Sequence, residues 1–525
     1  MTTANESTHP LQNPWLATIA VMSATFIFVL DSTIANVALP SMAGSFSASQ
    51  DESLWILTSY LIASGIILPS VDWFSGVFGR KKFFLACTLI FTFASVLCGF
   101  AHSLDMMIAA RILQGIGGGA ILPISQAIML ESFPLEKRGL AMSIFAFGVV
   151  VAPIIGPILG GWITDNYSWH WIFFINLPLG LLSVVASNAW IHDPPYAQKK
   201  ENQKIDFLGF GLLISWLVCL QVVLDKGQNA DWFNATWICV LSAISLISMV
   251  LFIISQIKNK DSIIDLSVFK DRNFAVGTAL LVLLNGVLYA SIAIMPLFLQ
   301  RLLGYTAYLS GLATMPRGVG SIIAIAMTAI LCSKIEERLF IVLGFACLGV
   351  SSLMFGFLNL DISMINIVIP NLITGMGLGF AMVPLSTISM VTLSNSQMTN
   401  AAGIQSLFKN IGGAIGTSIV NTMLMRYGQI HQGYMVGNLS PYNPVFVQKL
   451  QAVTGALAQN MNITLAEQKA NYMLYAQLLK QSNLWAYMDA FRIFGVICLI
   501  LIPFLLLLKK NEAGCNSKPP PSVGH

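Results

Sequence analysis

Two stretches of this sequence echo one another: Arg111-Ile-Leu-Gln-Gly-Ile-Gly-Gly-Gly-Ala-Ile-Leu-Pro-Ile-Ser125 and Ile373-Thr-Gly-Met-Gly-Leu-Gly-Phe-Ala-Met-Val-Pro-Leu-Ser386. Three glycines recur at one offset of 260 residues, which pairs Gly115, Gly117 and Gly119 with Gly375, Gly377 and Gly379. The echo predicts that the chain consists of two related halves. The alternative is chance, because small residues favour close packing of membrane helices and recur in them for that reason.

The composition points away from a water-soluble fold. Of the 525 residues, 56% are hydrophobic and only 10% are charged, whereas a soluble domain carries about 25% charged residues. A hydrocarbon layer about 30 Å thick is crossed by a helix of about 20 apolar residues. We predict an all-α polytopic membrane protein with fourteen spans, at residues 15–39, 54–74, 83–101, 106–130, 139–163, 171–191, 206–224, 235–256, 273–299, 309–332, 338–358, 364–390, 400–425 and 488–508.

The echo relates the fourth predicted span to the twelfth. An even number of crossings separates them, so both run in the same direction, which resembles the parallel halves of major-facilitator transporters. Halves of six helices would place the echo six spans apart, so two extra helices must lie between them. The predicted parts are a cytoplasmic tail (1–14), an N-terminal half (15–191), two linker helices (206–256), a C-terminal half (273–508) and a second cytoplasmic tail (509–525).

The basic residues orient this topology. They gather in alternate connections, at residues 80–82, 137–138, 199–204, 258–272, 334–338 and 509–510. Positive residues in short loops stay on the cytoplasmic side, so both termini are predicted to be cytoplasmic. The first apolar run lacks a preceding basic segment and a clear cleavage site, so we expect it to be retained as a span. The spacing of the eight cysteines suggests neither a metal site nor a disulfide framework.

One long polar connection, residues 426–487, lies on the non-cytoplasmic side of this topology. It is rich in Gln, Asn, Tyr and Ala, and it contains few helix-breaking residues after Pro444. Helical spacing in its second part predicts an amphipathic stripe of Leu465, Gln468, Tyr472, Tyr475 and Leu479. We interpret the segment as a hairpin that docks another protein, with a solvated loop as the alternative.

The first span contains an acidic residue, Asp31, about 12 Å from its outer end. The fourth span runs the opposite way and places Arg111 within one helical turn of the same depth. Ionised side chains at such depth are costly unless paired or wetted, and they commonly mark ion or proton pathways. Burial favours a protonated carboxyl and a nearby cation favours an ionised one, so alternating exposure would exchange protons. The alternative is an ion pair that only fixes the two helices together.

The fifth predicted span is dense in residues that break helices in soluble proteins, among them Gly148, Pro153, Gly156 and Pro157. Membrane spans tolerate such residues. We interpret this helix as a pliable seal that takes part in conformational gating, with simple close packing as the alternative.

A second gating element is predicted between the second and third spans, where Asp72 precedes Arg80 and Lys81. Asp72 is expected to hold a cation or a helix N-terminus in one conformation and to release it in another. The thirteenth span, which carries Lys409, is the candidate partner.

Polar, aromatic and methionine side chains within the spans predict a substrate cavity, because such side chains adapt to varied ligands. The candidate cavity residues are Asn36, Gln114, Gln126, Asn285, Tyr289, Met295, Phe298, Arg317 and Met382. For Arg317, a structural link to a backbone carbonyl is the alternative. The sequence holds no phosphate-binding Gly-Lys-Ser/Thr loop and no histidine pair at metal-ligand spacing. We therefore expect no enzyme, no cofactor, no metal and no nucleic-acid partner.

Several motifs resemble those of fourteen-helix drug:proton antiporters. Leu30-Asp-Ser-Thr-Ile-Ala-Asn-Val-Ala-Leu-Pro40 is similar to their first-helix motif, Arg111-Ile-Leu-Gln-Gly-Ile-Gly117 to that of the fourth helix, and residues 148–161 to the antiporter motif of the fifth. Further similarity is specific to EmrB-type bacterial exporters, in residues 169–180, 224–233 and 265–274. The resemblance covers residues 15–510. Two positions depart from the family pattern, Gly76 in the cytoplasmic motif and His170 within Trp-His-Trp, which weakens the expected inner-gate contact.

The resemblance implies a proton-coupled antiporter of the bacterial inner membrane that exports hydrophobic or amphipathic drugs, with the proton gradient as its energy source. It implies that Asp31 and Arg111 take part in proton coupling. It also implies a periplasmic membrane-fusion protein and an outer-membrane channel as partners in a tripartite efflux system. One alternative is an exporter dedicated to one metabolite, such as a siderophore or a fatty acid. A more distant alternative is a membrane sensor that transports nothing.

Overall fold

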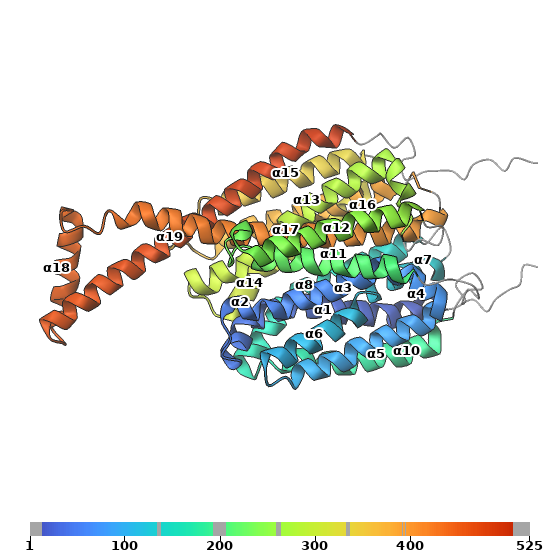
Figure 1. Cartoon of the computed structure of the whole chain (residues 1–525), viewed down its shortest axis with the longest axis horizontal. Coiled ribbons are helices and arrows are strands. Elements are labelled where there is room, and N and C mark those ends of the chain that lie inside the picture. Colours follow the sequence, from blue (N-terminus) through green and yellow to red (C-terminus); the bar gives the residue numbers. More distant parts are fainter. Residues whose placement is uncertain are drawn as a thin grey trace, which may run out of the picture.

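The computed structural model describes residues 13–133, 138–192, 206–258, 264–331, 336–390, 392–393 and 395–507. Within these ranges every regular element is a helix, and most long helices lie side by side along one common direction (Figure 1). Twelve of the described helices are long and apolar enough to cross a membrane. The prediction of an all-α membrane protein is confirmed.

The N-terminal half contains the first six predicted spans, several of them built from two shorter helices. Its elements are α1 (Pro14–Ser45), α2 (Gln50–Ser53), α3 (Trp55–Ile67), η1 (Leu68–Ser70), α4 (Val71–Phe78), α5 (Arg80–Gly99), α6 (Leu104–Gly118), α7 (Ile121–Ser132), α8 (Arg138–Asn166), α9 (Trp171–Phe174) and α10 (Asn176–Trp190).

Two linker helices and the C-terminal half follow. Their elements are α11 (Phe207–Lys226), α12 (Thr236–Lys258), α13 (Arg272–Leu297), α14 (Ala307–Leu331), α15 (Glu337–Phe355), α16 (Ile365–Met390), α17 (Asn395–Val436), α18 (Pro444–Ala458) and α19 (Ile463–Leu501), with short turns of other helix types between some of them.

Each predicted span coincides with one helix or with consecutive helical elements, yet the total of fourteen crossings stays a prediction. The second span corresponds to α3 and the two elements that follow it. On its own, α3 has 13 residues and is short for a crossing. The thirteenth is met by α17, which is not among the twelve helices that are apolar enough on their own. Polar residues along the helix, among them Lys409, Asn410 and Asn421, lower its mean hydropathy.

Several helices begin at the capping residues that the sequence supplies. The side chains of Asn13, Ser103 and Asp271 accept hydrogen bonds from backbone N–H groups in the first turns of α1, α6 and α13. Such caps satisfy donors that have no partner within the helix. These caps help fix where α1, α6 and α13 begin.

The glycine echo has the same packing role in both halves. Gly115 of α6 and Gly119, which caps its C-terminus, lie against the backbone of α3, and Gly117 between them lies against the backbone of α5. A side chain at any of these positions would collide with main-chain atoms, so the helices approach closely only through glycine. In the C-terminal half the matching contacts are those of Gly375 and Gly379 with α14 and of Gly377 with α15. This shared geometry supports the predicted relation between the halves.

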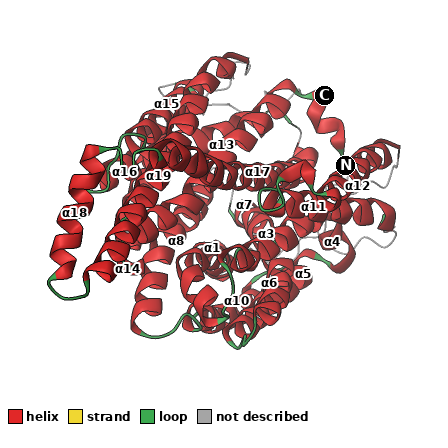
Figure 2. Cartoon of the chain, turned by 60° about the vertical axis from the view of Figure 1, so that its left-hand side comes forward, coloured by secondary structure: helices red, strands yellow, loops and turns green. Residues whose placement is uncertain are grey.

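The first linker helix, α11, touches both halves (Figure 2). The Thr58 hydroxyl of α3 donates a hydrogen bond to Asp225 at 3.2 Å. On the other side, the Ser418 hydroxyl of α17 donates to the carbonyl of Leu224. Hence α11 bridges α3 and α17.

Residues 426–487 form a helical arm. The helix α17 runs without a break to Val436, α18 follows, and α19 returns into the bundle. Figure 1 shows this arm projecting from the end of the bundle that carries α2, with α18 at its tip. The expectation of a helical hairpin in this segment agrees with the structure.

The predicted stripe on the arm lies on its exposed face. Leu465 and Tyr472 are exposed, at 56% and 72%, and the buried face of α19 is instead formed by Ala466, Ala470, Leu474 and Leu478. Small alanines allow α19 to pack closely within the hairpin, which turns the larger side chains outward.

Candidate functional site

Asp31 of α1 and Arg111 of α6 form an ion pair inside the N-terminal half. Arg111 Nη1 lies 2.7 Å from Asp31 Oδ2, and both side chains are fully buried. Gln114 donates to Asp31 Oδ1 at 3.0 Å and accepts from Arg111 Nη1 at 2.7 Å. The charge pair that the matched depths allow is therefore present, and it is enclosed in a hydrogen-bond network.

Asn176 completes the partners of Asp31 and was missed in the sequence. Its amide donates to Asp31 Oδ1 at 2.9 Å and to the Ser95 hydroxyl at 2.9 Å. Asn176 is the first residue of α10 and is fully buried. A polar side chain at the start of an apolar span was the available signal, but sequence alone does not show that α10 lies beside α1.

Arg111 reaches from this network toward the centre of the protein. Its Nε donates to the backbone carbonyl of Ile56 at 3.1 Å, and its guanidinium lies over the ring of Tyr60, 4.3 Å from the centroid. A cation over an aromatic face is stabilised by the ring quadrupole. Both Arg111 and Tyr60 also line the large central cavity. Arg111 therefore connects the hydrogen-bond network around Asp31 to that cavity.

The central cavity has a volume of about 2070 Å³ and is lined by both halves and by α11. Six predicted cavity residues line it: Asn36, Gln126, Tyr289, Met295, Arg317 and Met382. The volume exceeds the roughly 300–1,000 Å³ of an ordinary small-molecule site. It is large enough for varied ligands.

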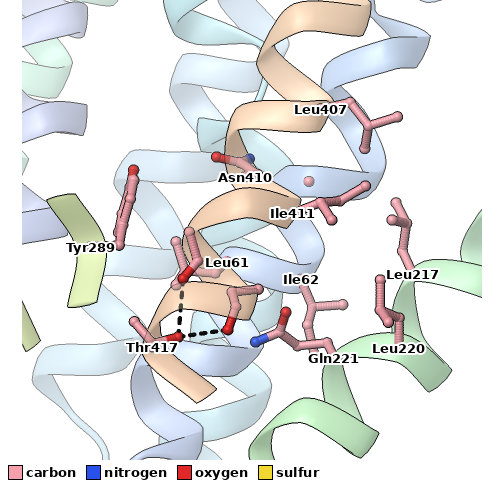
Figure 3. A pocket seen from close by; sticks show the side chains of 13 residues that line it. Leu61, Ile62, Leu217, Leu220, Gln221, Tyr289, Leu407, Asn410, Ile411 and Thr417 are labelled. Carbon is pink, nitrogen blue, oxygen red and sulfur yellow. Dashed lines mark hydrogen bonds between the residues drawn. The ribbon is translucent and has the colours of Figure 1, made fainter. Parts of the chain in front are cut away.

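A narrow recess of about 50 Å³ opens between α3, α11 and α17, and Figure 3 shows its side chains. Leu61, Gln221, Tyr289 and Thr417 line both this recess and the large cavity. The linker helix α11 thus supplies part of the wall.

Three predicted cavity residues do not line the cavity, so those predictions are wrong. Gln114 is turned toward the Asp31 pair. Asn285 returns its amide to the carbonyl of Leu281 in its own helix. Phe298 is 1% exposed and packs against Tyr487 in the C-terminal core, with 5.5 Å between ring centroids. Each of these side chains contacts a neighbour within the protein and does not face the cavity.

The fifth span lies between the halves, as a seal requires. The helix α8 continues through Pro153 and Pro157, and it packs against α1 on one side and α14 on the other. Gly148 and Gly156 face Met22 and Thr33 of α1. The two prolines line the cavity, which places the helix-breaking residues where the halves meet; the gating role stays a prediction.

The second predicted gating element, with Lys409 as its candidate partner, is described only in part by the structure. The side chain of Asp72 lies outside the part of the chain that the structure describes. Lys81 donates to the backbone carbonyl of Asn188 at the end of α10, at 2.7 Å, and Arg80 begins α5. Lys409 reaches the Ser386 hydroxyl at 3.4 Å and lines the central cavity. Lys81 therefore anchors α10, and the gating role of this element stays a prediction.

His170, which departs from the family pattern, lies in the connection before α9. Its Nδ1 is 2.6 Å from the Ser168 hydroxyl, and its ring stacks on Trp169 with 3.6 Å between centroids. Burial and the nearby His102 lower the pKa of the His170 imidazole. The lower pKa favours the neutral form of this imidazole at neutral pH.

Comparisons with known proteins agree with this architecture. The Major Facilitator Superfamily model matches residues 21–417. The chain is 35% identical to the Multidrug export protein EmrB of Haemophilus influenzae over 432 residues, 82% of this chain and 84% of that protein. It is 34% identical to the Fatty acid resistance protein FarB of Neisseria gonorrhoeae over 436 residues, 83% of this chain and 86% of that protein.

A solved structure supports the fold alone. A bacterial homologue of the human lysosomal transporter Spinster, in an inward-facing and unoccupied conformation, matches with a TM-score of 0.59 at 14% identity. The match covers 97% of this chain and 100% of that one. By its family model, its relatives and its two-halved helical architecture, the chain belongs to the Major Facilitator Superfamily and is a membrane transporter, not an enzyme.

Proposed function

We propose that this protein is a proton-coupled antiporter that exports hydrophobic or amphipathic toxic compounds across the bacterial inner membrane, with both termini in the cytoplasm. The observation that carries the proposal is the buried pair of Asp31 and Arg111 beside the central cavity. A multidrug export protein is among the relatives with about a third of identical residues. The proton gradient is the energy source in this proposal.

The geometry suggests how a proton and a substrate would be coupled. Arg111 belongs both to the Asp31 network and to the cavity wall. A movement that draws Arg111 away would leave the Asp31 carboxylate buried without its cation, which favours protonation. Return of Arg111 would favour proton release. Substrate exchange in the cavity and proton exchange at Asp31 would then share one moving part.

The proposal is tested with purified protein in proteoliposomes that contain a hydrophobic dye and carry an imposed proton gradient. We expect the dye to move uphill against its own concentration gradient, and the movement to stop when a protonophore collapses the proton gradient. Uphill transport that persists without a proton gradient would exclude proton coupling. A total lack of dye movement would exclude export of such dyes.

A dedicated metabolite exporter is the second candidate, and the relative named for fatty acid resistance favours it. The two candidates differ in breadth of substrate. A panel of unrelated toxic compounds, tested on a strain that expresses the protein, separates them. Resistance to several chemical classes supports the multidrug candidate, and resistance to one class supports the dedicated exporter.

We also propose that the helical arm docks a periplasmic membrane-fusion protein, which in turn meets an outer-membrane channel. The arm extends beyond the bundle, and α18 contributes no buried residue of its own (Figure 1). Exposed apolar side chains along it include Val445, Ile463, Leu465 and Tyr472. Apolar side chains exposed outside the membrane are typical of protein-interaction surfaces.

Removing the tip of the arm is expected to separate docking from transport. Replacing residues 437–462 by a short Gly-Ser linker deletes α18 and leaves the membrane ends of α17 and α19 in place. We expect dye transport in vesicles to keep the wild-type rate and co-purification of a fusion protein encoded with this chain to be lost. A second variant replaces Leu465 and Tyr472 by Ser in the full-length arm and should lose co-purification as well. Co-purification that survives both changes would contradict docking at the arm.

A further inference from the structure

The two halves differ in how they hold an arginine inside the helical bundle. In the N-terminal half, Arg111 is neutralised by Asp31 at 2.7 Å. The C-terminal half has Asn371 at the position that the glycine echo pairs with Arg111, and its arginine, Arg317, comes instead from α14. Among the described residues Arg317 forms no ion pair with a carboxylate. The C-terminal half therefore presents an uncompensated positive charge.

Neutral partners hold the Arg317 guanidinium in place. Its Nη2 donates to the Ser291 hydroxyl at 2.9 Å and to the Asn371 side-chain oxygen at 3.1 Å. Asn371 is itself fixed, because its amide donates to the carbonyls of Ala313 and Ile367. The buried Nε of Arg317 has no hydrogen-bond partner among the described residues. The guanidinium therefore keeps N–H donors that no described residue accepts from, and an anion can accept hydrogen bonds from such donors.

The surrounding cavity carries an excess of positive charge. Apart from Arg111, which is paired, its charged lining residues are Arg301, Arg317, Lys409 and Lys480 against Asp225 and Glu337. Among the described residues, Lys409 has one hydrogen-bond partner, the neutral Ser386 hydroxyl at 3.4 Å. Within low-dielectric walls such an excess attracts anions more strongly than it would in water.

An apolar surface adjoins the arginine. Leu288 and Ile292 of α13 and Leu378 and Met382 of α16 line the same cavity. Each pair is spaced four residues apart, so each forms a stripe along one helix face. On α16 the stripe ends about 16 Å beyond Asn371 at 1.5 Å per residue. The cavity thus offers a cation at one end and a long apolar wall next to it.

We propose that Arg317 is the headgroup subsite for an amphipathic anion, a molecule with one carboxylate, sulfonate or phosphate and an apolar tail. The guanidinium binds the anionic group, and the stripes on α13 and α16 hold the tail. This assignment rests on the proposed function, because it names a substrate class for the same cavity. The anion comes either from a diffusible amphipath or from the headgroup of a membrane lipid.

Binding of a matched pair of probes tests the subsite without any gradient. The probes are 11-(dansylamino)undecanoic acid and its primary amide, which share the same tail and differ in whether the headgroup is an anion. The protein is held in phosphatidylcholine nanodiscs. We expect the wild-type protein to bind the acid at least about tenfold more tightly than the amide, and Arg317→Gln to remove that preference while amide binding is unchanged. Arg317→Lys should keep part of the preference, because lysine keeps the positive charge but lacks the planar array of N–H donors of the guanidinium.

Arg301→Gln is the matched control, since Arg301 lines the cavity but is exposed; it should keep the preference for the acid. Competition by phosphatidylglycerol added to the nanodiscs identifies a lipid headgroup as the source, and lack of competition identifies a diffusible amphipath. If the wild-type protein binds acid and amide equally, or if Arg317→Gln keeps the preference, the subsite is refuted. Neither result depends on transport, so a protein that fails to pump dye but keeps the preference contradicts only the proposed function.

Discussion

Replacing Asp31 by asparagine is expected to abolish gradient-driven dye transport while binding of the dye is retained. Asparagine has nearly the shape of aspartate but cannot take up and release a proton near neutral pH. Asp31 itself is not among the residues that line the cavity, whereas Arg111 is. Accumulation of dye in proteoliposomes under an imposed proton gradient should therefore fall to the level of protein-free vesicles, and dye affinity measured without a gradient should stay within about twofold of wild type.

The variant needs a control for folding, because Asp31→Asn leaves Arg111 buried without its counter-ion. Loss of one partner of a buried ion pair destabilises a protein by about 3–5 kcal/mol. The double variant Asp31→Asn with Arg111→Gln removes both charges and should regain stability, seen as a higher melting temperature than that of the single variant. It should still fail to pump. Uphill pumping by either variant at the wild-type rate would exclude Asp31 from proton coupling.

The pair at the centre of this prediction could be inferred from the sequence because depth in a membrane is set by residue count. A helix rises 1.5 Å per residue, so the distance of Asp31 and Arg111 from the same surface follows from where their spans end. The hydrocarbon also makes isolated charges costly, which draws attention to two opposite charges at one depth in an apolar sequence. Their roles in coupling are not decided by that geometry.

Contacts that depend on the rotation of a helix about its axis could not be read in the same way. Asn176 has the right depth to meet Asp31, yet only the placement of α10 beside α1 brings its amide to 2.9 Å. Asn285 and Phe298 have the residue types expected in a cavity and face other partners. The spacing on α19 groups Leu465 with Tyr472, but only the packing of the hairpin shows that their face is turned outward.

The glycine echo was the strongest fold signal, and it leads to a second prediction of large effect. A Cβ atom on Gly117 would lie 2.5 Å from the backbone nitrogen of Phe91 and 2.7 Å from the carbonyl oxygen of Cys87, both in α5. Main-chain atoms of a packed helix cannot move aside as a flexible side chain can. Gly117→Val is therefore expected to force α6 away from α5 and to cost about 3 kcal/mol or more, at or above the upper end for overpacking in a core.

The damage should reach the proton site, because Gln114 and Arg111 lie one and two helical turns before Gly117 on α6. We expect a low yield of monodisperse protein in size-exclusion chromatography, a lower melting temperature, and no pumping by the protein that remains. Gly377→Val should behave alike, since a Cβ there would lie 2.8 Å from the carbonyl oxygen of Gly344. The matched control is Gly211→Val in α11, where nothing lies within 4 Å of the added carbon. Equal yield and melting temperature for Gly117→Val and this control would show that the helices do not depend on glycine for their close approach. The shared glycine contacts would then no longer support the relation between the two halves.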